Sequence, residues 1–363
     1  MSQLGLGMEP DTETSRRRDR PQRSGARPVL VAVAALLAVG LAVFLGLRSI
    51  GGGSSQQFSG DGDGSVTVVV AKGDSLRQIG RTLAEAGVVA DEGAFVDAAS
   101  ADPEAQSIAP GTYTLHEHMG GDAAVALMLD PASRQVKKLA IPEGWRMERI
   151  ITAAAKATGL SEDSLKESLS RAGTLGLPAY AEGSPEGFLF PATYEFQPGV
   201  TSDQVIKAML ERFDQSATDA DLATAAKAVG RTPLEIITVA SILEIEGAPE
   251  DYDKVARVIY NRLEQGMRLQ LDSTVNYALG VSSLKLTADQ LKTDSPYNTY
   301  LQKGLPPGPI DSPGDAAIQA ALNPASGNWL YFVTTDPKTK KTEFATTYDQ
   351  FLALKKKFQA NAG

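Results

Sequence analysis

One glutamate stands directly after a stretch of sequence that carries no charge. Residues 236–243 are Ile-Ile-Thr-Val-Ala-Ser-Ile-Leu, and Glu244 follows them. A helix without a charged face is buried on all sides, so this carboxyl group begins in a dry environment. Desolvation raises the pKa of a carboxyl group, and the negative end of a helix dipole raises it further. Glu244 is therefore our candidate general acid; the alternative is a structural ion pair with Arg257 or Arg262.

The sequence marks both ends of the helix that positions this glutamate. Thr232 can cap the first turn, Pro233 suits the first helical position and Glu235 completes a capping box. Gly247 stands where a left-handed glycine commonly ends a helix. We therefore expect one helix within residues 232–247.

A second group of polar residues lies downstream. Residues 267–275 alternate between apolar and polar, which predicts an extended segment with Gln270 and Asp272 on one face. Residues 295–300 and 304–310 together hold four prolines, two glycines and two tyrosines, which fix a loop rigidly. Tyrosine and asparagine in a rigid loop suit sugars, which need ring stacking and amide hydrogen bonds. A purely structural loop at a domain seam is the alternative.

Two upstream segments differ in character. Residues 186–196 interleave aromatic and apolar residues with two carboxylates, which is typical of the wall of a site rather than of a linker. The Pro-Glu-Gly turn at 142–144 is interpreted as a simple change of direction. Strand-like residues lead into this turn, and helical patterns follow it.

Other patterns imitate catalytic or metal sites. Residues 73–76, Gly-Asp-Ser-Leu, match the nucleophile block of a class of esterases, but no histidine stands where the base of a serine hydrolase is required. His116 and His118 could share one face of a strand, yet a third metal ligand is not evident nearby. The chain has no cysteine, which excludes disulfides, thiolate metal sites and a cysteine nucleophile. We expect neither a metal nor a cofactor.

Length and charge predict a chain of several parts. With 363 residues and 42% apolar content it can bury two folded units. Residues 29–47 are uncharged and mainly apolar, long enough to cross a bilayer as one helix. Six arginines precede this segment, so an Arg-rich tail at 1–28 would stay in the cytoplasm and everything after it would lie outside. A cleaved signal peptide is the alternative. The sequence thus predicts a single-pass protein of a bacterial cell membrane.

The segment after the predicted span begins with a linker and a small domain. Residues 48–65 are rich in Gly, Ser and Asp, which predicts a flexible linker. A strand at 66–71, two helices and a returning strand at 111–115 follow. This order and the string Lys-Gly-Asp-Ser-Leu at 72–76 resemble the LysM carbohydrate-binding module, which implies a LysM-like domain at 66–135.

Several strings, in the same order, resemble the YceG-like family, the MltG endolytic murein transglycosylases. They are Glu-Gly-Phe-Leu-Phe-Pro-Ala-Thr-Tyr at 186–194, Ala-Ser-Ile-Leu-Glu at 240–244, the polar segment 261–272, and the two loop strings at 295–300 and 304–310. The resemblance covers roughly residues 66–355. It implies an enzyme that cuts the MurNAc-GlcNAc β-1,4 bond within nascent peptidoglycan strands, leaves 1,6-anhydroMurNAc ends and so terminates elongation. The family's catalytic glutamate corresponds to Glu244.

The sequence departs from the family pattern at two places. Ile245 stands where a lysine is common, and residues 341–348 lack the histidine that many members carry in their last strand. A single glutamate is nevertheless sufficient for this chemistry, because the muramic acid C6 hydroxyl attacks. The same carboxyl group first protonates the glycosidic oxygen and then accepts a proton from that hydroxyl.

Polar clustering and the family motifs together suggest the residues that hold the sugars. The expected substrate-binding residues are Asn261, Gln270, Asp272, Tyr297, Asn298 and Tyr300. Two other functions stay open. A peptidoglycan hydrolase would need a second carboxylate about 5 to 9 Å from Glu244, with Asp272 as the candidate. A non-catalytic scaffold would bind glycan strands without cutting them.

The predicted fold class is α+β: a small LysM-like domain, then a mainly helical catalytic domain at 136–363 with short strands such as 329–334 and 342–346, after a single transmembrane helix. Peptidoglycan glycan strands are the expected substrate, and the membrane is the expected anchor site. Peptidoglycan synthases and division proteins are candidate protein partners. The net charge of −9 makes nucleic acid a poor partner.

Overall fold

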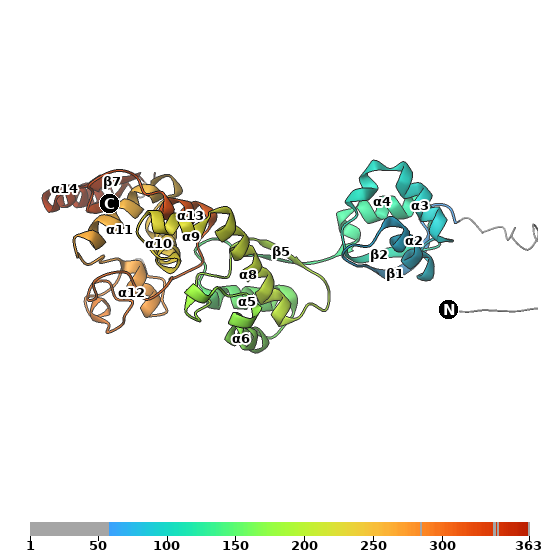
Figure 1. The fold of residues 1–363 in the computed structure, drawn as a ribbon, viewed down its shortest axis with the longest axis horizontal. Coiled ribbons are helices and arrows are strands. Elements are labelled where there is room, and N and C mark those ends of the chain that lie inside the picture. Colours follow the sequence, from blue (N-terminus) through green and yellow to red (C-terminus); the bar gives the residue numbers. More distant parts are fainter. Residues whose placement is uncertain (1–57, 284, 337–338, 340, 362–363) are drawn as a thin grey trace, which may run out of the picture. The chain divides into compact units, whose positions relative to one another are not determined.

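The computed structural model describes residues 58–361, apart from 284, 337–338 and 340. Figure 1 shows a chain rich in helices with short strands, which confirms the mixed α and β composition predicted from the sequence. The described residues contain two separate hydrophobic cores, one before and one after residue 136. Five short 3-10 helices occur in this part of the chain, at Pro103–Ser107, Pro131–Ser133, Ala179–Ala181, Pro249–Asp251 and Gln290–Lys292.

No helix in the described part of the chain has the length and apolarity needed to cross a membrane. The longest of these helices, Ser202–Asp219, carries charged residues throughout. The predicted span at 29–47 lies outside the described residues, as do the tail at 1–28 and most of the linker at 48–65. The prediction of a single-pass membrane protein is therefore corrected, and we assign the chain to no compartment.

The first core belongs to a small unit with a three-stranded antiparallel sheet. Its sheet order is β1-β2-β3, and Val68 pairs with Tyr113. Ser75 caps the first helix: its hydroxyl accepts from the Gln78 N–H, and the Gln78 side chain bonds back to the Ser75 N–H. This serine is a capping residue and not a nucleophile. The elements are β1 (Asp63–Val70), α2 (Leu76–Glu85), α3 (Glu92–Ala101), β2 (Gly111–Glu117), α4 (Gly121–Leu129) and β3 (Arg134–Gln135).

The second core belongs to a larger, mainly helical body with two antiparallel strand pairs, β4-β5 and β6-β7. The predicted strand pair near the C-terminus is confirmed, with Val333 opposite Glu343. The elements are β4 (Lys137–Ala140), α5 (Met147–Thr158), α6 (Glu162–Ser170), α7 (Ala172–Leu175), β5 (Thr193–Phe196), α8 (Ser202–Asp219), α9 (Leu222–Ala228), α10 (Pro233–Glu246), α11 (Tyr252–Glu264), α12 (Asp272–Ala278), α13 (Asp315–Leu322), β6 (Tyr331–Asp336), β7 (Lys341–Ala345) and α14 (Tyr348–Asn361).

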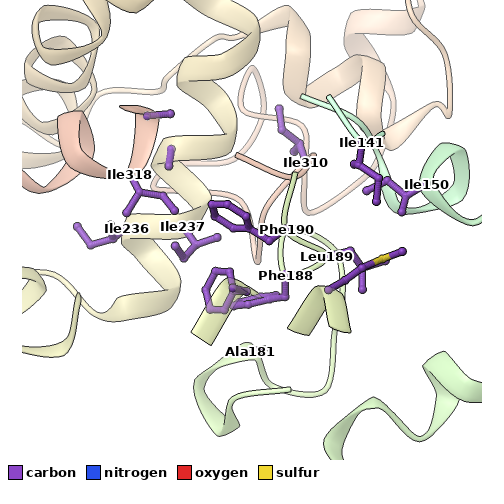
Figure 2. Packing of buried hydrophobic residues seen from close by; sticks show 14 of the residues in the cluster. Ile141, Ile150, Ala181, Phe188, Leu189, Phe190, Ile236, Ile237, Ile310 and Ile318 are labelled. Atoms are coloured by element: carbon purple, nitrogen blue, oxygen red, sulfur yellow. The ribbon is translucent and has the colours of Figure 1, made fainter. Parts of the chain in front are cut away.

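Helix α10 runs through the core of this body. Every residue from 236 to 243 is buried, as the uncharged stretch predicts. Figure 2 shows Ile236 and Ile237 of α10 among the side chains of Ile318 from α13 and Phe190. Each such side chain contributes about 1.5–3 kcal/mol when it leaves water, so α10 is firmly anchored. Its C-terminal residues are thereby held at a fixed place.

The capping box predicted for α10 is confirmed, but its C-terminus differs from the prediction. The Glu235 N–H donates to the Thr232 hydroxyl at 3.2 Å, and the Thr232 N–H donates to the Glu235 carboxylate at 2.8 Å. Gly247 is extended, with φ −124°, and not left-handed. Its lack of a side chain matters for another reason: a Cβ there would lie 3.0 Å from the Tyr252 ring.

The extended segment predicted at 267–275 is shorter than expected. Helix α12 begins at Asp272, because Gln270 turns the chain with φ +50° and the Leu271 N–H then bonds to the Thr299 hydroxyl at 3.0 Å. Gln270 and Asp272 therefore do not share one face of a strand. The segments 295–300 and 304–310 contain no helix or strand, as their prolines and glycines predict.

We predict that Thr232→Ala destabilises the helical body by about 1 kcal/mol, because the first turn of α10 loses its side-chain acceptor. Chemical denaturation followed by circular dichroism measures the change. Thr232→Ser keeps the hydroxyl and serves as the control. Equal stability of the alanine and serine variants would contradict a stabilising role for this cap.

Candidate active site

Three elements hold the carboxyl group of Glu244. The residue lies in the last turn of α10 and is partly buried. The Tyr252 hydroxyl, from the first turn of α11, donates to Glu244 Oε2 at 2.9 Å. The backbone N–H of Gly314, at the N-cap of α13, donates to Glu244 Oε1 at 2.9 Å. Both oxygens are therefore fixed in direction by donors that belong to the packed body.

The pKa of Glu244 is raised above its ordinary value. Burial is the largest cause, and the charge of Glu143 adds to it, while the hydrogen bonds from Gly314 and Tyr252 act in the opposite direction. Burial also raises the pKa of Tyr252, so its hydroxyl group stays protonated and can donate a hydrogen bond to Glu244. The carboxyl group is thus biased towards its acid form, and donors are in place for the ionised form.

The alternative of a structural ion pair finds no support in the contacts of the two arginines. Arg257 donates through Nε to the Ala325 carbonyl at 2.6 Å, and Arg262 donates through Nε to the Leu330 carbonyl at 2.6 Å. Both guanidinium groups are directed at backbone oxygens instead of at Glu244. The perturbed carboxyl group is therefore a candidate for chemistry and not half of a salt bridge.

The turn at 142–144 does more than change direction, contrary to our interpretation of the sequence. The Gly144 N–H donates to the Ser312 carbonyl, and the Ser312 N–H donates to the Trp145 carbonyl, both at 2.9 Å. This pairing sets Glu143 against Gly314, where a Cβ would lie 1.7 Å from Glu143 Oε1. Only glycine fits there, and its N–H is the one that binds Glu244.

Two further carboxyl groups lie deeper, Glu186 and Asp311. Glu186 is 5% exposed and accepts from the Met147 N–H at 2.9 Å and from the Tyr277 hydroxyl at 3.3 Å. Burial raises the pKa of Glu186 to about 7. Asp311 is 1% exposed, and neither of its carboxyl oxygens has a hydrogen-bond partner. Burial, followed by the charges of Glu244 and Glu186, holds the pKa of Asp311 well above its usual range.

Two pockets adjoin at the end of α10. The first, which we call the Glu244 pocket, measures about 580 Å³ and is lined by residues that include Glu244, Glu246, Tyr252, Thr334 and Thr342. The second, which we call the Asp311 pocket, measures about 370 Å³ and is lined by residues that include Trp145, Arg146, Ser273, Asn276, Ile310 and Asp311. Ile245, which follows Glu244, lines both pockets.

Part of the predicted substrate-binding set forms a second polar group. The Tyr300 hydroxyl donates to Asp272 Oδ1 at 2.6 Å. Asp272 acts electrostatically on Glu246, whereas the carboxylate that acts on Glu244 is Glu143. Asp272 is therefore hydrogen-bonded to Tyr300 and influences the pKa of Glu246, while Glu143 influences that of Glu244.

The other predicted residues have different surroundings. The Asn261 amide donates to the carbonyls of residues 327 and 329. Asn298 is fully buried and donates to those of residues 291 and 293. The Tyr297 ring lies 4.7 Å from the Tyr277 ring, and Gln270 is exposed. Of the described residues that line the two pockets, none belongs to the predicted substrate-binding set.

From the sequence we predicted no role for Tyr252, Gly314 or Asp311, and we assigned Glu143 only to a turn. Tyr252 and Gly314 contact Glu244 from other elements, and no spacing in the sequence indicates that contact. Glu186 lies in the predicted aromatic wall at 186–196. Gly187 brings this wall against the proline-rich loop: a Cβ there would lie 2.4 Å from Pro309 Cβ.

The YceG-like family matches residues 68–357, which is most of the chain. The chain belongs to the YceG-like family.

Two relatives of this YceG-like chain carry the name endolytic murein transglycosylase. The protein of Streptococcus pneumoniae strain D39 is 31% identical over 334 residues, which covers 80% of this chain. This chain spans 59% of the length of that relative. The protein of Bacillus subtilis strain 168 is 30% identical over 292 residues, which covers 75% of this chain and 79% of the relative.

A solved structure agrees with the fold. The crystal structure of a yceG-like protein from Listeria monocytogenes superposes with a TM-score of 0.56 at 29% sequence identity. The match covers 80% of this chain and 98% of that one.

Two substitutions should move the pKa of Glu244 in opposite directions. Glu143→Gln removes a negative charge that disfavours ionisation, so the pKa of Glu244 falls. Tyr252→Phe removes a hydrogen bond that favours ionisation, so the pKa of Glu244 rises. Carbon NMR titration of labelled glutamate carboxyl groups measures both shifts. Glu167→Gln, on the exposed face of α6, is the matched control, and shifts of the same sign in both test variants would contradict this account.

Glu186 should make stability depend on pH. Its folded-state pKa of about 7 exceeds its ordinary value of 4.5, so the folded state holds a proton that the unfolded state releases. Stability therefore falls as pH rises from about 4.5 to 7, by on the order of 3 kcal/mol at most. Glu186→Gln should remove most of this loss. Urea unfolding at pH 5 and pH 8 tests the prediction, which fails if wild type and variant show the same pH dependence.

Proposed function

We propose that this chain is a lytic transglycosylase that cuts within peptidoglycan glycan strands at the MurNAc-GlcNAc β-1,4 bond and leaves 1,6-anhydroMurNAc ends. The observation that carries the proposal is the state of Glu244: a partly buried carboxyl group with a raised pKa, held by two donors at the wall of a pocket. The relatives named endolytic murein transglycosylase support the same reaction class.

The geometry suits one carboxyl group acting twice. Burial raises the pKa of Glu244 and so favours the acid form, which can protonate the oxygen of the glycosidic bond. When the proton leaves, the Tyr252 hydroxyl and the Gly314 N–H stabilise the resulting carboxylate. This carboxylate then accepts the proton of the C6 hydroxyl as that oxygen closes the 1,6-anhydro ring. Glu244 therefore acts first as the acid and then as the base, and no second carboxylate is needed.

The surroundings of Glu244 favour this reaction over hydrolysis. A hydrolase needs an ionised second carboxylate, about 5–5.5 Å away in retaining enzymes and about 6.5–9.5 Å away in inverting ones. Burial, followed by the charges of Glu244 and Glu186, raises the pKa of Asp311 well above its usual range and disfavours the ionised form, and Asp272 acts on Glu246. Neither group is suited to attack the sugar or to activate water.

The substrate-binding set is proposed in two roles. We propose that Gln270, Asp272, Tyr297 and Tyr300 contact sugars of the strand, because their side chains are at least partly exposed. Asn261 and Asn298 are proposed to act indirectly, since their amides hold the loops that carry the site.

The small unit is proposed as a LysM-like glycan-binding domain at 66–135, followed by the catalytic domain at 136–363. The chain order of strand, two helices and strand, with β1 antiparallel to β2, supports this division. Cutting within a nascent strand would end its elongation. We still propose peptidoglycan synthases and division proteins as candidate protein partners.

We predict that the protein releases fragments that are one water lighter than hydrolysis products when it digests purified peptidoglycan strands. Glu244→Gln should lower cleavage by about 10²- to 10⁴-fold, because amide nitrogen cannot serve as the acid. Mass spectrometry of the products measures both effects. Activity should fall as pH rises through the raised pKa of Glu244.

Glu250→Gln is the control, because Glu250 is exposed and lines the same pocket. Products with ordinary reducing ends would identify a hydrolase instead. Strand binding without any cleavage by the wild-type protein would identify a scaffold.

A further inference from the structure

Arg262, in the last turn of α11, is a partly buried cation whose hydrogen bonds go to backbone oxygens. Its Nε–H donates to the Leu330 carbonyl at 2.6 Å. Its Nη1 donates to the Leu269 carbonyl at 2.6 Å and to the Arg268 carbonyl at 3.4 Å. Hydrogen bonds from a charged donor are stronger than those between neutral groups. One guanidinium group therefore joins two segments that are far apart in the sequence.

The first of these segments leads into the hairpin of β6 and β7. Leu330 directly precedes Tyr331, the first residue of β6, and the Leu330 N–H donates to the Ala345 carbonyl of β7 at 2.9 Å. The guanidinium carbon of Arg262 lies 5.1 Å from the centroid of the Tyr331 ring, which is within cation–π distance. Arg262 thus holds the hairpin where β6 begins.

The second segment leads into α12. Leu269 is 1% exposed, and Gln270 follows it with a left-handed backbone. The Gln270 N–H donates to the Thr299 carbonyl at 3.1 Å. Helix α12 then begins at Asp272. The guanidinium group therefore fixes one end of a short turn, and the first turn of α12 lies at its other end.

Both segments lead to walls of the two pockets. The strand β6 carries Thr334, which lines the Glu244 pocket. The helix α12 carries Ser273, which lines the Asp311 pocket. Among the described residues that line these pockets, Arg262 does not occur. Its influence on a bound strand must therefore pass through the walls that it holds.

We propose that Arg262 is a positioning residue for strand cleavage, which keeps the β6–β7 hairpin and the start of α12 at the separation that lets the pocket walls hold the strand. This role rests on the proposed function. The planar guanidinium group presents its donors in a rigid fork, so it reaches both segments at once, whereas the ammonium group of lysine is a point charge. Arginine also stays protonated across the working pH range, so the positioning does not vary with pH.

Strand cleavage by Arg262→Lys in the full-length protein tests this role, because the charge is kept and the fork is lost. Walls that hold the strand equally in the ground state and in the transition state affect KM and not kcat. KM should therefore rise about tenfold, which is about 1.4 kcal/mol, while kcat stays within about threefold. The pH at which activity falls should not move, because the Tyr252 and Gly314 donors to Glu244 are unchanged.

Arg257→Lys is the matched control. Arg257 lies on the same helix, and its Nε–H donates to the Ala325 carbonyl at 2.6 Å, upstream of the hairpin. Its KM should stay within about threefold of the wild-type value. A partly unfolded sample would instead lower the apparent kcat and leave KM unchanged. The positioning role is overturned if Arg262→Lys keeps the wild-type KM, if its pH profile shifts, or if Arg257→Lys raises KM equally.

Hydrogen exchange followed by NMR tests the same role without any cleavage. In Arg262→Lys the amides of Gln270 and Leu330 should exchange about tenfold faster than in the wild type, because the segments lose their shared donor. In Arg257→Lys the Gln270 amide should exchange at the wild-type rate. Faster exchange in Arg262→Lys together with a wild-type protein that cuts nothing would refute the enzyme and keep the link between the segments. Unchanged exchange at both amides would refute the positioning role.

The wild-type protein allows a check that needs no variant. Rotation of the Arg262 guanidinium group should be hindered, so its Nη atoms should give separate NMR signals. The exposed side chain of Arg268 is the reference for free rotation. Equally free rotation of the two groups would overturn the proposal.

Discussion

The balance of forces on one carboxyl group organises the body of this protein. Helix α10 takes Glu244 to the edge of the core, where burial favours the acid form. The Tyr252 hydroxyl and the Gly314 N–H favour the ionised form. In the proposed reaction Glu244 first gives and then takes a proton, which needs both influences, because either one alone would fix it in a single state. The packed core around α10 keeps that balance in place.

The same region concentrates acidic side chains at a cost in stability. The charge of Glu143 acts on Glu244, and the charges of Glu244 and Glu186 act on Asp311. Burial opposes the ionisation of Glu186 and Asp311. Natural proteins commonly keep such strained groups at functional sites and compensate elsewhere. Here the apolar core around α10 and α13 offsets this cost, and within it the Phe188 ring of the aromatic wall lies 4.9 Å from the Phe213 ring of α8.

Close backbone approaches explain several glycines of the site. Gly314 leaves room for Glu143, Gly187 leaves room for Pro309, and Gly247 leaves room for the Tyr252 ring. Gly314 and Gly187 each join two segments that are distant in sequence, whereas Gly247 packs against the start of the next helix, α11. The residues that line the two pockets come from five parts of the chain: 144–149, 244–252, 273–283, 310–311, and the group Thr334, Thr339 and Thr342.

The sequence alone determined the local features. An uncharged stretch between a capping box and a glycine predicted α10 and singled out Glu244, because helix capping and burial depend on residues close in sequence. Short sequence motifs indicated the similarity to the YceG-like family. The loops at 295–300 and 304–310 followed from proline and glycine, whose backbone preferences are intrinsic.

Tertiary structure alone decided the partners of Glu244. The residues around it come from separate segments of the chain: Tyr252, Gly314, Glu143 and Asp311. The alternating pattern around Gln270 also did not predict that a helix begins at Asp272. The tertiary structure also places Asn298 in the interior, where its amide donates to the carbonyl of a loop residue. Hydrogen bonds and desolvation at a site depend on which segments meet in space. That meeting is set by the packing of the whole core, which no local pattern encodes.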